Sequence, residues 1–118
     1  MPRLIASPVS IPVPGGKQID EYIGRVATST SAVSVAHMRA PAGWSEPPQA
    51  PEFEEITLVL KGTLHIEHAG GTLEVATGQA VITAAGERVR YLVSDEGAEY
   101  VAICLPAFAP DLAHREDD

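Results

Sequence analysis

The sequence predicts an all-β protein, a small antiparallel barrel or sandwich. From Ser31 to Leu105, short runs of Val, Ile and Leu are interrupted by glycine or proline every ~8–12 residues, a spacing typical of such folds. With 118 residues, 45% of them hydrophobic and 20% charged, the chain suits one domain around one core. We expect an N-terminal arm and edge strand over 1–30, a barrel over 31–106 and a docked tail over 107–118.

Seven runs are expected to form strands in two packed sheets, with Gly70 and Gly71 closing the clearest hairpin. They are Ala32–Arg39, Glu55–Leu60, Thr63–His68, Thr72–Val75, Ala80–Ala84, Val89–Val93 and Glu99–Leu105. Before them, the arm Val9–Val13 alternates with prolines, which cannot donate to a ladder, so it can lie only at a sheet edge, where such arms often reach a neighbouring subunit. Gln18–Ile23 fits a helical turn or a twisted strand, and its short periodicity leaves both open.

Two further segments fall outside the strand pattern. Pro41–Glu52 holds four prolines and must be a loop; a loop this long in a compact domain is often functional. In the tail, Phe108 is expected to cover one end of the sandwich and Asp111 to cap a short helical turn.

Charge and cysteine content narrow the range of partners and compartments. The net charge of −8 and a pI near 4.8 repel phosphate backbones and anionic membranes, so neither nucleic acid nor a membrane is an expected partner. Cys104, the single cysteine, excludes an internal disulfide and suits a reducing compartment. No stretch approaches ~18 consecutive apolar residues. Together with the single cysteine, this predicts a soluble, cytoplasmic protein.

Alternation along strands separates the candidate metal ligands and selects one acidic residue. His65 and His68 are three apart, so they face opposite sides of a strand, and His37 and His114 stand alone. If Ile56, Leu58 and Leu60 pack between the sheets, Glu55, Thr57 and Val59 face the other side, which in a barrel is the lumen. A carboxylate there can bind a cation, pair with Arg39 or Arg90, or stay protonated as a general acid or base. A solvated strand end is the equally weighted alternative.

The glycine spacing carries a family resemblance. Gly43, Gln49, Glu55 and Gly62 keep the spacing of the first cupin motif, while Gly78 and Gly86 match the second. The chain therefore resembles a small single-domain cupin with a double-stranded β-helix, or jelly-roll, barrel. The segment Phe53–Ile66 is most similar to the cupin domain of the ethanolamine-utilisation protein EutQ, and the ending Cys104–Arg115 to small bacterial cupins without an assigned reaction.

The resemblance also shows what is missing. Gln49, Pro51 and Val89 stand where the cupin motifs place histidine ligands, so only Glu55 remains of four. No metal cofactor is therefore expected; the alternative is a divalent cation held by oxygens at Gln49 and Glu55, with Glu46 or Glu52 recruited if the loop folds inward.

These considerations predict an organic pocket in place of the metal. Glu55 and Tyr91 are the candidate catalytic residues, and the candidate ligand-binding residues are Arg39, Trp44, Gln49, Val89 and Tyr100. The predicted function is binding of a small organic molecule by a cupin barrel that forms a homodimer, with Glu55 as acid or base if it is an enzyme. Two alternatives are a non-catalytic, EutQ-like accessory or structural cupin that acts through its dimer interface, and an atypical metal-dependent lyase, isomerase or dioxygenase.

Overall fold

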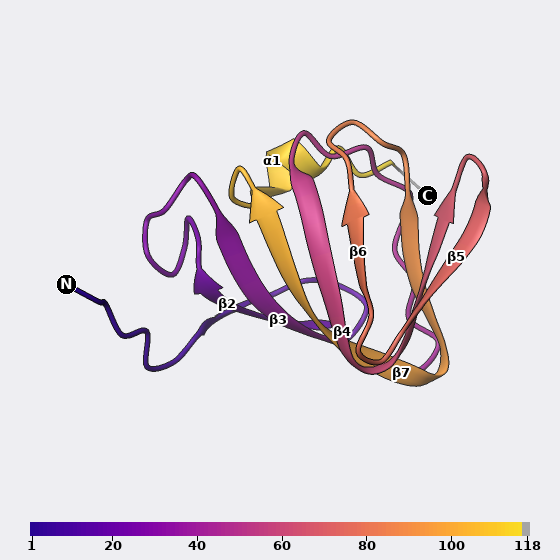
Figure 1. The fold of residues 1–118 in the computed structure, drawn as a ribbon, viewed down its shortest axis with the longest axis horizontal. Coiled ribbons are helices and arrows are strands. Elements are labelled where there is room, and N and C mark those ends of the chain that lie inside the picture. Colours follow the sequence, from indigo (N-terminus) through magenta and orange to yellow (C-terminus); the bar gives the residue numbers. More distant parts are fainter. Residues whose placement is uncertain (117–118) are drawn as a thin grey trace.

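The computed structural model describes residues 1–116 and is almost entirely β-structure, as predicted (Figure 1). Only one short helix, near the C-terminus, interrupts this pattern in the described residues. In chain order the elements are β1 (Val9–Ile11), β2 (Gln18–Ile23), β3 (Ser34–Ala40), β4 (Glu54–His68), β5 (Gly71–Ala76), β6 (Ala80–Thr83), β7 (Arg90–Leu105) and α1 (Pro110–Ala113).

All the described strands belong to one antiparallel sheet that curls around a lumen. The order is β1-β2-β3-β7-β4-β5, with β6 pairing the free side of β4. The two packed sheets that were predicted are therefore two halves of one continuous sheet. Two pairs of predicted strands are each a single long strand, the 15-residue β4 and the 16-residue β7, and these run through both halves of the barrel. They bend instead of ending, because the register shifts on either side of Lys61 let the ladder turn a corner.

The N-terminal segments extend this sheet. β1 pairs only with β2 and so lies at the edge, as the prolines predicted. Gln18–Ile23, left open by its short periodicity, is a strand because β3 offers it a complete ladder. Pro41–Glu52 is a loop held inward by three isolated bridges, one from Ser45 to Leu92 and two from Gln49, to Val89 and to Arg115. Contact of the arm with another subunit stays a prediction.

The tail returns to close one end of the barrel. Phe108 packs edge-on against Phe53, with ring centroids 5.8 Å apart and an interplanar angle of 66°. Asp111 does not cap α1: the helix starts earlier, after Ala109, which makes no side-chain cap, and Asp111 lies in the first turn. No helix within residues 1–116 has the length and apolar character needed to cross a membrane.

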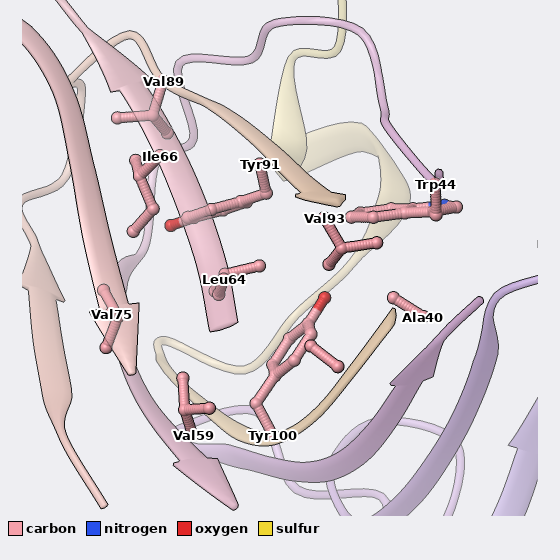
Figure 2. Packing of buried hydrophobic residues seen from close by; sticks show 11 residues of the cluster. Ala40, Trp44, Val59, Leu64, Ile66, Val75, Val89, Tyr91, Val93 and Tyr100 are labelled. Carbon is pink, nitrogen blue, oxygen red and sulfur yellow. The ribbon is translucent and has the colours of Figure 1, made fainter. Parts of the chain in front are cut away.

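The core packs inside the barrel, and most of its side chains come from β4 and β7 (Figure 2). Glu55, Thr57 and Val59 are buried on the inner face of β4, as alternation predicted. Their neighbours Leu58 and Leu60 do not pack between sheets; they are 41% and 47% exposed on the outer face. The reason is that a single curled sheet encloses one face only.

The corner between the two halves depends on Gly62. Its φ is +76°, and a Cβ built there would lie 2.3 Å from the carbonyl oxygen of Gly97. Gly78 has a similar φ of +83° with open space around it, which makes it a matched control. We expect Gly62→Ala to lose about 3 kcal/mol or more of unfolding free energy, because backbone must move, and Gly78→Ala to lose only about 1 kcal/mol through backbone strain. Urea unfolding followed by circular dichroism measures both; equal losses would contradict the steric argument.

Candidate functional site

A cavity of about 380 Å³ opens at the mouth of the barrel. Its walls come from the inner faces of β4 and β7, the proline loop, the N-terminal arm and the tail. Four predicted site residues line it: Gln49, Glu55, Tyr91 and Tyr100. The chain therefore brings together, in one chamber, residues that are up to 51 positions apart in its sequence.

Glu55 lies deep in this cavity on β4. Its Oε2 accepts a hydrogen bond of 3.0 Å from the Thr57 hydroxyl, and the Cys104 thiol lies 3.9 Å from Oε1. Burial raises the pKa of the Glu55 carboxyl, and the positive charge of Lys17 opposes part of that rise. Burial also raises the pKa of Cys104, the one free thiol, which keeps it protonated.

Gln49 and Tyr100 present polar atoms that the described chain leaves unpaired. The backbone of Gln49 exchanges two hydrogen bonds of 2.9 Å with Val89, which fixes where its side chain begins. Its Oε1 and the Tyr100 hydroxyl are buried without a hydrogen-bond partner in residues 1–116. Leaving such atoms unpaired costs about 1–3 kcal/mol each, so both are suited to pair with something that enters the cavity.

Three charged residues in the cavity were not among the predicted catalytic or ligand-binding residues. Lys17 comes from the N-terminal arm, and its Nζ lies 4.3 Å from the ring centroid of Trp44. Burial lowers the pKa of Lys17 and raises that of Glu46, whose carboxylate accepts a 3.3 Å hydrogen bond from Arg115. Glu46 does point inward, as its proposed recruitment as a cation ligand required, whereas Glu52 pairs with His114 away from the cavity.

No periodic signal marks these three residues, because they lie in irregular segments whose direction is set by packing. Lys17 precedes β2, Glu46 lies in the proline loop, and Arg115 follows α1. Only a rule for the path of the loops, which sequence patterns do not provide, could have placed them together.

Arg39 lies outside this cavity, beside a separate pocket of about 500 Å³, and its role as a ligand-binding residue stays a prediction. Alternation along β3 turns Met38 and Ala40 inward and Arg39 outward. There its guanidinium donates a 2.8 Å hydrogen bond to Asp20 and lies 3.5 Å from Glu99. Of the three roles considered for the Glu55 carboxyl, pairing with Arg39 or Arg90 is absent among residues 1–116, because Arg39 pairs with Asp20 and Arg90 donates to Glu67.

Val89 and Trp44 do not line this cavity but lie in the core beside it. They are 2% and 6% exposed and belong to the core cluster that supports it (Figure 2). The Tyr91 hydroxyl reaches Thr83 at 3.1 Å, and burial raises its pKa. Catalytic roles for Glu55 and Tyr91 stay predictions.

The side chains in the lumen do not fit the histidine-bound metal centre of cupins. Within residues 1–116, no three or more His, Cys, Asp or Glu side chains are placed to share one ion. Gln49 is a weak donor, Val89 is hydrocarbon, and the ammonium of Lys17 shares the cavity with Glu55. A cation bound by the oxygens of Gln49 and Glu55 stays a prediction.

Comparison with solved structures identifies the architecture. An oxalate decarboxylase variant from Bacillus subtilis aligns with a TM-score of 0.79 over 94% of this chain and 31% of its own, at 14% identity. The chain has the cupin fold. The polyketide cyclase RemF from Streptomyces resistomycificus gives 0.76 over 100% and 87% of the two chains, at 18% identity. A putative ethanolamine-utilisation protein EutQ from Salmonella typhimurium gives 0.63 over 78% and 71%, at 19%, in agreement with the predicted resemblance.

Comparison of sequences corrects the predicted function of this cupin barrel. No family model matches the chain. A curated relative from Myxococcus xanthus (strain DK1622), named endoribonuclease YbeY, is 46% identical over 107 residues. These cover 90% of this chain and 36% of the relative, so the chain spans little more than a third of that protein.

That name refers to RNA cleavage and overturns the predicted small-molecule-binding function. It overturns with it the EutQ-like accessory alternative and the lyase, isomerase or dioxygenase alternative. The prediction failed because it derived function from a fold and its missing ligands, and one fold hosts many unrelated functions.

The buried carboxyl of Glu55 predicts a pH dependence of stability. A carboxyl whose pKa is raised by folding holds more protons in the folded state, so its contribution falls as pH rises above the ordinary value of about 4.5. Glu55→Gln stays neutral and escapes this loss. We expect the stability of Glu55→Gln relative to wild type to increase above pH 4.5 by up to about 1.4 kcal/mol per pH unit, until the folded pKa is passed.

Urea unfolding at several pH values between 4.5 and 9 measures this difference. Glu54→Gln is the control, since Glu54 is the exposed neighbour on the same strand. A difference between wild type and Glu55→Gln that stays flat with pH would contradict the assignment.

Proposed function

We propose that this chain takes part in RNA cleavage by an endoribonuclease and that its share is to bind the RNA strand. The observation that carries the proposal is the 46% identity to the relative named endoribonuclease YbeY over 90% of this chain. Most of that relative lies outside the matched part, so groups that cleave RNA can lie there.

The barrel suits one unpaired base better than a duplex or a long stretch of backbone. A net charge of −8 works against tracking many phosphates, and for this reason nucleic acid was not an expected partner; binding of a single unpaired base revises that expectation. Recognition of single-stranded RNA relies instead on splayed bases that stack on aromatic rings and are hydrogen-bonded at their edges. The rings of Phe53, Tyr91, Tyr100 and Phe108 line a cavity of about 380 Å³, within the usual range for a ligand site.

Polar groups in the cavity are suited to bind one unpaired base and its flanking phosphate. The unpaired Gln49 Oε1 accepts from an N–H of a base, and the unpaired Tyr100 hydroxyl can donate or accept. Lys17 and Arg115 are the cations that line the same cavity within the described residues, and they provide contacts for a flanking phosphate. Glu46 beside Arg115 keeps the local charge balanced until a phosphate arrives.

We place this RNA binding in the cytoplasm. The proposed substrate, RNA, is found there, and the single cysteine of the chain suits a reducing compartment.

Binding of fluorescein-labelled single-stranded RNA hexamers, measured by fluorescence anisotropy, tests the proposal. We expect saturable binding that Gln49→Ala weakens about fivefold or more, because one hydrogen bond is worth about 1 kcal/mol. Arg39→Ala, on the outer face, is the matched control and should leave the affinity unchanged. Duplex RNA of the same sequence should bind more weakly.

Two outcomes would sink this proposal. One is the absence of saturable binding by single-stranded RNA, and the other is binding that Gln49→Ala leaves intact. Incubation of the purified chain with the same hexamers tests whether the chain only binds RNA, since cleavage by this chain alone would contradict a purely binding role.

A further inference from the structure

Two buried carboxyl groups share the cavity, and they differ in how many of their oxygens are already paired. Glu55 has a donor near each oxygen, the Thr57 hydroxyl at Oε2 and the Cys104 thiol at Oε1. Glu46 receives one donor, from Arg115 to Oε2 at 3.3 Å, and its Oε1 accepts no hydrogen bond within residues 1–116. Each carboxylate oxygen has two lone pairs, so Glu46 is the carboxyl that can accept donors from an occupant.

The surroundings of Glu46 hold it in place and favour its charged form. Its backbone N–H donates to the carbonyl oxygen of Tyr91 at 3.3 Å, and its own carbonyl oxygen accepts from Nε of Arg90 at 3.2 Å. Burial raises the pKa of the Glu46 carboxyl, while the positive charges of Lys17 and Arg115 oppose that rise. The loop thus presents an anchored carboxylate at the wall of the cavity.

Lys17 supplies a donor close to this carboxylate. Its Nζ lies against the rings of Trp44 and Tyr100, 4.3 and 5.3 Å from their centroids, and makes no ion pair within the described residues. Glu46 is the charge that most opposes the lowering of the Lys17 pKa by burial, which indicates that the two side chains are near one another. Charged or neutral, the nitrogen carries N–H groups that can pair with an acceptor of an occupant.

The four RNA bases differ in the donors on their Watson–Crick edges. Guanine carries two adjacent donors, N1–H and the N2 amino group, beside the acceptor O6, whereas adenine, cytosine and uracil carry one donor group each. A carboxylate accepts two adjacent N–H groups as a bidentate pair, which adds both strength and selectivity. A carboxylate beside an amine therefore matches guanine better than the other three bases.

We propose that the cavity selects guanine among the bases of single-stranded RNA, with the carboxylate of Glu46 accepting from N1–H and N2–H and the Nζ of Lys17 donating to O6. The second hydrogen of the N2 amino group remains for the unpaired Oε1 of Gln49. This selection rests on the RNA binding proposed above and names the base that the strand supplies.

Fluorescence anisotropy with labelled hexamers that differ at one position tests the selection. We expect a hexamer of adenosines with one internal guanosine to bind about tenfold more tightly than the all-adenosine hexamer, because adenine cannot form the bidentate pair. Inosine lacks only the N2 amino group of guanosine, so inosine at the same position should lose about fivefold of that affinity. This comparison needs no variant of the protein.

A substitution at Glu46 tests whether its carboxylate is the selecting group. In Glu46→Gln the two hexamers should bind within about twofold of each other, because an amide has one acceptor oxygen and directs its own N–H groups at the base. Glu52→Gln is the matched control: Glu52 lies in the same loop but pairs with His114 away from the cavity, so the tenfold preference should persist. A general loss of structure would lower both affinities and leave their ratio unchanged, and circular dichroism verifies folding.

The outcomes separate this selection from RNA binding itself. If no hexamer binds saturably, RNA binding fails and the selection fails with it. If hexamers bind without preference for guanosine, or if the preference survives Glu46→Gln, the selection is overturned while RNA binding stands. Unlabelled GMP should compete at least about tenfold less well than the guanosine hexamer, because it lacks neighbouring bases; equal competition would overturn a strand as the ligand.

Discussion

The pairing of β4 with β7 is the interaction on which the rest of the structure depends. These two strands form the longest ladder, from Glu54 opposite Leu105 to Glu67 opposite Arg90, and they bend together where Gly62 approaches Gly97. Because both strands pass through the bend, one sheet forms both walls of the lumen. Glu55, Tyr91 and Tyr100 all project from this pair, so the polar chamber and the barrel have a common origin.

The irregular segments then decide the chemistry of the chamber. The arm contributes Lys17, the proline loop Glu46 and Gln49, and the tail Arg115. Acid and base are buried close together: burial raises the pKa of both carboxyls and lowers that of the amine, and each opposite charge limits the shift of the other. This leaves a cavity with little net charge but several polar atoms able to pair with an incoming group.

In this protein, the shared fold does not determine the function. Proteins with names as different as oxalate decarboxylase, polyketide cyclase and EutQ share its architecture at 14–19% identity. The relative named for RNA cleavage is far more similar in sequence, at 46% identity, but most of its length lies outside the match. Chemistry on such a barrel follows from the side chains at its mouth and from what is joined to it, and the barrel itself is compatible with all of these names.

The sequence alone determined the features that follow from local rules. Alternation placed Glu55 on the inner face, prolines assigned the arm to an edge and Pro41–Glu52 to a loop, and glycine spacing indicated the cupin architecture. These succeed because side-chain direction on a strand and the missing N–H of proline are properties of a few consecutive residues.

Tertiary structure decided what depends on distant partners. It joined predicted strands through Gly62 and Gly97, turned Arg39 to the outside, and brought Lys17, Glu46 and Arg115 to one cavity. The direction of a loop is set by the segments it packs against, which the chain encodes only through contacts across its whole length. Leu58 shows the same limit: alternation separated it from Glu55, but only the closure of one sheet revealed that its side is the outer one.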